Sequence, residues 1–114
     1  MARKPGPVLH EILTAIEGIE RATIGKNFDE FQRDWLLRHG VQRGIEIISE
    51  AVRHLPAELL AMHPTVPWQR IRGAGNILRH EYFRVADRVI WGVVREDLAD
   101  LKAAVEAMRS NVPE

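Results

Sequence analysis

Residues 41–52 read VQRGIEIISEAV, and this stretch decides the fold because an apolar and a polar helical pattern run through it together. Apolar side chains recur every three or four residues, which is the period of an amphipathic helix. Continued upstream, the same stripe predicts a second helix that is longer than the first. We expect the buried stripe to be Phe31, Trp35, Ile45, Ile48 and Val52.

A polar stripe lies beside the apolar one and consists of His39, Arg43, Glu46 and Glu50. Their spacing places all four on one side of the helix. Two interpretations stay open. The stripe is either a solvated face held by pairs such as Arg43–Glu46, or the wall of a cleft that supplies an arginine for phosphate and a carboxylate for imidazole.

The start and the middle of this helix carry further signals. Asn27 or Asp29 can cap its first turn. Gly40 and Gly44 interrupt its middle, where each costs roughly 1 kcal/mol relative to alanine. We therefore expect these glycines to allow close approach of neighbouring helices.

The rest of the chain also has a helical period, and glycine and proline divide it into segments. No segment alternates with a period of two over a convincing length, so no sheet is expected. The sequence predicts one all-α domain over residues 1–114, an up-and-down bundle of four to five helices. Besides the helix above, the predicted segments are a first helix after Pro7 that ends near Gly25, a helical turn at Ala57–Met62, a third helix containing Trp68–Leu78 after Pro67, and a last helix from about Val85 to Met108.

The composition is that of an ordinary soluble protein of 114 residues, with 46% apolar and 28% charged side chains. Cysteine is absent, which excludes disulfides, thiolate metal sites and a cysteine nucleophile. No apolar run is long enough for a membrane span, and the start lacks the apolar centre of a signal peptide. We therefore expect a cytoplasmic location and no contact with a membrane.

Sixteen basic and sixteen acidic side chains cancel overall, but arginine is concentrated in residues 69–95. That segment has six arginines, two acids and no lysine, so its net charge is +4. The planar guanidinium fork suits phosphate oxygens better than a lysine point charge does. The alternative is that several of these arginines pair with acids on neighbouring helices.

Within this segment, Arg79-His80-Glu81-Tyr82 is the first candidate for chemistry. Guanidinium, imidazole and phenol can hold a phosphate and move a proton without a metal. In a helix, His80 and Tyr82 would point about 200° apart and could not cooperate. We therefore expect the third helix to stop near His80, so that both side chains enter one cleft.

Three other interpretations are rejected. The run from Gly73 to Asn76 follows no strand and precedes no lysine, so it is not a nucleotide-binding P-loop. The five histidines do not fall at the spacings of metal ligands, and no metal site is expected. The three tryptophans lie on or beside apolar stripes, where core packing explains them: Trp35, Trp68 and Trp91.

Several stretches together give the chain a resemblance to a known family. It resembles the HepT-like branch of the HEPN superfamily, small helical proteins paired with minimal nucleotidyltransferases in bacterial toxin–antitoxin modules, over nearly its whole length. The matching stretches are residues 10–16 (HEILTAI), 42–51 (QRGIEIISEA), 60–68 (LAMHPTVPW), 75–82 (GNILRHEY) and 89–94 (VIWGVV) with Asp97-Leu98.

The family signature is an arginine, usually an asparagine next, three further residues, a histidine, one residue and a tyrosine. Asn76, His80 and Tyr82 match it, whereas Gly75 stands at the arginine position. Arg79, adjacent to His80, and Arg72, two turns upstream on roughly the same face, are the candidates to supply the missing charge.

The resemblance implies a metal-independent endoribonuclease that needs no cofactor. His80 would transfer the proton and an arginine would stabilise the charge on phosphorus. A two-fold homodimer would bring two copies of His80 into one cleft. Tyr82 matches the tyrosine that the nucleotidyltransferase antitoxin modifies with AMP in related modules.

The alternative is a HEPN module that has lost catalysis and binds the nucleotidyltransferase or RNA. Gly75 favours this alternative. The retention of His80 and Tyr82 favours the enzyme, which is the function we expect.

Overall fold

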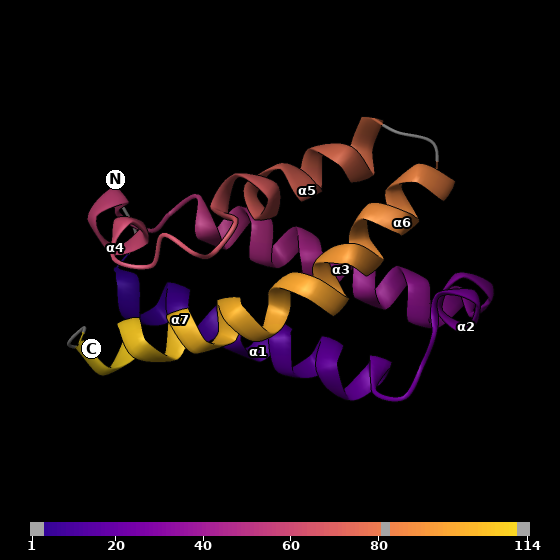
Figure 1. Ribbon diagram of the computed structural model, residues 1–114, viewed down its shortest axis with the longest axis horizontal. Coiled ribbons are helices and arrows are strands. Elements are labelled where there is room, and N and C mark those ends of the chain that lie inside the picture. The colour runs from indigo at the N-terminus through magenta and orange to yellow at the C-terminus, as the bar shows by residue number, and fades with distance from the viewer. Residues whose placement is uncertain (1–3, 81–82, 112–114) are drawn as a thin grey trace.

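Four long helical segments run back and forth along the long axis of the computed structural model, which describes residues 4–80 and 83–111 (Figure 1). No strand occurs among these residues, so the predicted all-α up-and-down bundle is confirmed. The long segments are α1 (Pro5–Thr23), α3 (Trp35–Val52), α5 (Trp68–His80), and α6 (Phe83–Gly92) with α7 (Leu98–Asn111). The short helices are α2 (Phe28–Arg33) and α4 (Ala57–Ala61).

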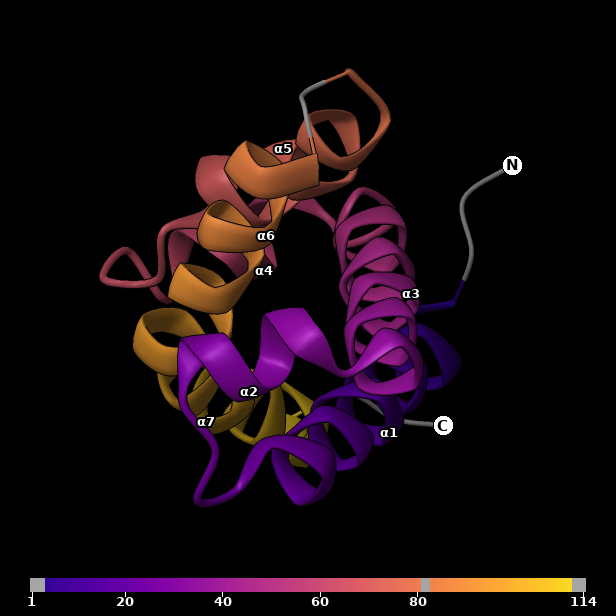
Figure 2. The ribbon, with the colours of Figure 1, turned by 90° about the vertical axis from the view of Figure 1, so that its right-hand side faces the viewer.

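The core lies between α1, α3, α5 and the last segment of α6 and α7, and α2 closes one end of it (Figure 2). Phe31 of α2 is fully buried and stacks on Trp91, with ring centroids 4.9 Å apart. In the described part of the chain, no helix combines the length and apolar character that crossing a membrane requires. The fully buried long side chains include Leu9, Ile12, Ile16, Ile45, Ile48, Ile90, Leu101 and Met108.

The predicted long second helix is wrong in one respect, because the chain breaks it at Asp34 into α2 and α3. Asp34 has an extended backbone, and its carboxylate accepts a 3.0 Å hydrogen bond from the Leu37 amide as the cap of α3. Asn27 caps α2 in a reciprocal box with Glu30, as predicted. The apolar period does not continue across the break, so Trp35 is 64% exposed rather than buried.

The two glycines of α3 differ in how closely a neighbouring helix approaches them. A Cβ at Gly44 would lie 2.8 Å from Ile19 Cδ1 of α1, so the close approach predicted there is present. A Cβ at Gly40 would meet nothing within 4 Å, and the same holds for Gly73 of α5. Of these three glycines, only Gly44 is therefore in tight contact with a neighbouring helix, through the Ile19 side chain.

The last helical segment is continuous from α6 to α7 but contains one wide turn, a π-helix at Val93–Asp97. Gly92 precedes this turn, and a Cβ there would lie 2.6 Å from Arg70 Nη2 of α5. Arg70 pairs with Glu96 at 3.5 Å and with Asp97 at 3.1 Å. The wide turn thus coincides with the ion pairs that join α5 to the last segment.

We predict that Gly44→Ala lowers the free energy of unfolding by about 1 kcal/mol. Overpacking against Ile19 costs about 1–3 kcal/mol, which exceeds the gain in helix propensity of about 1 kcal/mol. Gly73→Ala is the matched control in open space and should raise stability by about 0.5–1 kcal/mol. Urea denaturation of both variants measures the difference, and equal stabilisation by the two substitutions would contradict the close approach.

Candidate active site

A hollow of about 340 Å³ lies between α3 and α5, and its walls carry charged side chains from both helices. The α3 side supplies two arginines, two glutamates and a serine, and the α5 side supplies Gly75 and Arg79. The complete lining is Arg43, Glu46, Ser49, Glu50, Arg53, Gly75 and Arg79.

Small residues and two hydrogen bonds to one carbonyl hold α5 close to α3 and its C-cap at the floor of this hollow. The buried Ser49 hydroxyl donates a 2.8 Å hydrogen bond to the backbone carbonyl of Arg72. Arg53 Nη2 donates to the same carbonyl at 3.0 Å. A Cβ at Gly75 would lie 3.2 Å from Ser49 Oγ, which is a tight contact. A side chain at position 75 would therefore crowd Ser49.

Arg79 is the guanidinium of the hollow that is available for an anion. Arg43 faces Glu46 at 4.0 Å, and Glu50 pairs with His54 at 3.2 Å. Within the described part of the chain, Arg79 has no carboxylate partner. Its Nη1 lies 3.6 Å from the place that a Cβ at Gly75 would take. The Arg79 head group thus folds back along α5 to cover the glycine.

The structure brings four of the predicted site residues together in this hollow. Arg43, Glu46 and Glu50 of the polar stripe line it with Arg79, as the cleft interpretation of the stripe requires. The Arg43–Glu46 pair of the solvated-face interpretation is also present. His39 lies one turn before Arg43 and is not part of the lining.

The remaining candidate residues of α5 do not line the hollow and lie on the exposed surface of this helix. Arg72, Asn76 and His80 are exposed and follow one another at intervals of one turn. Arg72 reaches the hollow's floor only through its backbone carbonyl. The described part of α5 reaches His80, and the predicted end of the helix near this residue stays a prediction. Tyr82 lies outside the described residues, so its convergence with His80 stays a prediction.

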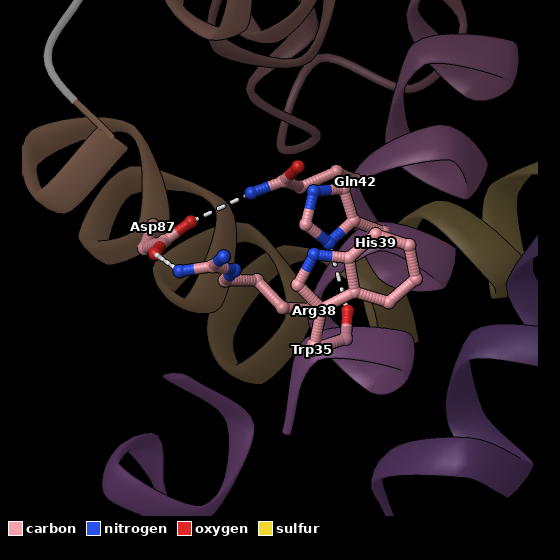
Figure 3. A network of polar contacts seen from close by, with 5 residues as sticks. All are labelled: Trp35, Arg38, His39, Gln42 and Asp87. Carbon is pink, nitrogen blue, oxygen red and sulfur yellow. Dashed lines mark hydrogen bonds and ion pairs between the residues drawn. The ribbon is translucent and has the colours of Figure 1, made fainter. Parts of the chain in front are cut away.

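A buried polar network between α3 and α6 was missed by the sequence analysis (Figure 3). Asp87 of α6 is fully buried and accepts a 2.7 Å hydrogen bond from Gln42 Nε2. Arg38 Nη1 lies 3.7 Å from its other carboxylate oxygen. The available signal was an acid beside Ala86 on the apolar face of α6, where a carboxylate must find a partner.

Three other arginines of the segment 69–95 have structural partners, but only Arg70 pairs with acids, as the alternative interpretation expected. Arg88 lies over the Phe28 ring at 4.7 Å, and Arg95 lies over Trp91 at 5.7 Å. Arg70 pairs with Asp97, whose pKa is raised by burial, although Arg70 itself lowers it. These three arginines are therefore explained by packing rather than by a ligand.

The structure also shows where the histidines and acids lie relative to one another and how the three tryptophans pack. Among residues 4–80 and 83–111, no three His, Asp or Glu side chains form a group that could hold a metal ion. Trp68 and Trp91 pack partly buried against the core, as expected. Trp35 does not, and its indole lies against His39 at the surface.

Comparisons with known proteins give consistent matches. A family model described as "Ribonuclease HepT-like" matches residues 12–108. The chain is similar to "Probable ribonuclease HepT" of Thermococcus cleftensis, with 37% identity over 109 residues, which cover 96% of this chain and 99% of that protein. It is also similar to "Putative RNase TTE0752" of Caldanaerobacter subterraneus subsp. tengcongensis, with 36% identity over 104 residues, which cover 91% and 93% of the two chains. No solved structure matches the chain significantly.

Proposed function

This chain belongs to the ribonuclease HepT-like family of the HEPN superfamily, and from that premise we propose that it is an endoribonuclease that cleaves RNA without a metal ion. The names of its relatives support the substrate class. The charged hollow between α3 and α5 supports a phosphate site at the position of the family signature.

The observation that carries the proposal is the place of Arg79. Gly75 stands where the family signature has its arginine, and the Arg79 Nη1 atom lies 3.6 Å from the site of the missing Cβ. A guanidinium is therefore present over position 75, although it comes from the next turn of the helix. Its planar fork can donate two parallel hydrogen bonds to phosphate oxygens.

The proposed reaction uses the RNA's own 2′-hydroxyl as nucleophile. The 2′-oxygen bonds to the neighbouring phosphorus and the bond from phosphorus to the 5′-oxygen breaks, which leaves a cyclic phosphate and a 5′-hydroxyl. His80 takes or gives the proton, and Arg79 stabilises the negative charge on the pentavalent phosphorus. The exposure of His80 at the end of α5 leaves it accessible to RNA.

A homodimer would supply the second proton transfer. One histidine cannot easily act as base and acid in the same step, whereas two copies of His80 in a common cleft can. An apolar groove of about 500 Å³ between α1 and α3 supports a second copy as its occupant. Arg43 lines both this groove and the charged hollow, so a copy in the groove would border the site.

We further propose that a nucleotidyltransferase antitoxin controls the enzyme through Tyr82. The phenol oxygen would attack the α-phosphorus of ATP, release pyrophosphate and give its proton to solvent. Tyr82 is the only tyrosine of the chain, so a tyrosine modification has no other place to occur. The added phosphate would occupy the arginine site in place of RNA.

The second candidate function, a binding subunit without catalysis, is favoured by Gly75 itself. Loss of the signature arginine would remove the charge that stabilises the transition state, while the fold and its partner surface would remain. The two functions differ in whether His80 is needed for an activity of the isolated protein.

We predict that the purified protein cleaves single-stranded RNA in the presence of EDTA. His80→Ala should slow this cleavage by about 10²–10⁴-fold, because it removes the general acid or base. His10→Ala, on the exposed face of α1, is the matched control and should cleave at the wild-type rate. Equal cleavage by His80→Ala would exclude His80 catalysis, and no cleavage by the wild type would favour the binding subunit.

Co-expression with a minimal nucleotidyltransferase should add one AMP to the peptide that contains Tyr82. Intact-mass and peptide mass spectrometry measure the addition, and the modified protein should lose RNA cleavage. The Tyr82→Phe variant lacks the accepting oxygen and should stay unmodified. An unmodified Tyr82 in a tight complex of the two proteins would indicate steric blocking instead.

A further inference from the structure

Trp35 and His39 form an aromatic pair at the surface of α3, outside the charged hollow (Figure 3). Their ring centroids lie 4.3 Å apart, and the ring planes are inclined by 30°. Trp35 is 64% exposed, although tryptophan is among the most costly side chains to leave in water. Neither the core nor the hollow explains this pair.

The His39 ring has a fixed orientation. Its Nδ1 atom lies 2.8 Å from the backbone carbonyl of Trp35. A carbonyl can only accept a hydrogen bond, so Nδ1 carries the proton and donates it. The contact holds imidazole against indole before any ligand arrives, which lowers the entropy cost of stacking on the pair.

The part of α3 that carries the aromatic pair is also held in place. Arg38 and Gln42 project from the adjacent face of α3 to the buried Asp87 carboxylate of α6 (Figure 3). The hydrogen bond from Gln42 is 2.7 Å long, and the Arg38 ion pair is 3.7 Å. The first turns of α3 are thus anchored to α6, and the aromatic pair stands on a rigid support.

The aromatic pair lies on the same side of α3 as Arg43, a lining residue of the charged hollow. Trp35, His39 and Arg43 follow at intervals of four residues, so their side chains fall within a sector of about 80° of the helix. Arg43 lines the hollow. The distance along the axis from Trp35 to Arg43 is about 12 Å. A chain with a phosphate in the hollow could therefore place a neighbouring nucleotide at Trp35.

We propose that Trp35 and His39 form a stacking platform for one base of a single-stranded RNA whose backbone crosses the hollow beside Arg43 and Arg79. Aromatic faces next to a groove of arginines are how proteins hold unpaired bases, since stacking needs no base pairing and the cations track the backbone. This inference rests on the proposed RNA substrate, and it adds the subsite that selects unpaired over paired RNA.

The test measures binding apart from cleavage. The probe is a fluorescein-labelled single strand with 2′-O-methyl riboses, which has no free 2′-hydroxyl to attack phosphorus. Trp35→Ala should weaken its binding about tenfold, which is the loss of one base stack. Trp35→Phe retains an aromatic face and should stay within about threefold of the wild type. Met62→Ala removes an equally exposed apolar side chain after α4 and should bind as the wild type does.

A series of probes, each lacking one base, decides whether the loss is due to stacking. In the wild type, one abasic position should weaken binding about tenfold, and in Trp35→Ala that position should cost nothing. An equal cost in both proteins, or unchanged binding by Trp35→Ala, would overturn the platform. If Trp35→Ala instead lost only dimer formation or partner binding, Trp35 would belong to a protein interface.

The two proposals fail in distinguishable ways. A wild type that binds the methylated probe through Trp35 but cleaves no RNA would keep the platform and remove the nuclease. A wild type that cleaves RNA through His80 with no contribution from Trp35 would keep the nuclease and remove the platform.

Discussion

The hydrogen bond from the Ser49 hydroxyl to the Arg72 carbonyl is the contact on which the candidate site depends. It joins α3 to α5 at the buried Ser49, and it requires a small side chain on α3 and almost none on α5. Gly75, one turn beyond Arg72 on α5, meets this requirement, since a Cβ there would lie 3.2 Å from the same hydroxyl. Arg43 of α3 and Arg79 of α5 line the hollow together with Ser49 and Gly75.

This close contact also explains how the chain can depart from the family signature and keep a guanidinium in place. A residue without a side chain at position 75 leaves room for the Arg79 head group to fold back over it. Side chains on a helix lean toward its N-terminus, so an arginine four residues later can reach the same surface. In the proposed function, Arg79 supplies the charge that the signature arginine supplies in the family.

The sequence predicted the helical class, the first and third helices and the Asn27 cap, because each rests on neighbouring residues. It did not predict the break at Asp34, since an aspartate there fits both the interior of a long helix and the cap of a new one. The Asp87 network was also missed, because its partner Gln42 is 45 residues away in sequence and depends on how α3 packs on α6. The role of the polar stripe of α3 also depends on helix packing. The sequence therefore left open whether this stripe was a solvated face or a wall of the site.

The most direct test of the central claim, that Arg79 replaces the arginine absent from position 75, is the rate of RNA cleavage by three proteins. Arg79→Ala should reduce kcat/KM by about 10²-fold or more, as loss of a donor to the transition state does. Gly75→Arg combined with Arg79→Ala should recover much of that loss, because the space left by Arg79 admits the new side chain once Ser49 shifts slightly. Wild-type rates in Arg79→Ala would contradict the claim, and so would a double variant no faster than Arg79→Ala.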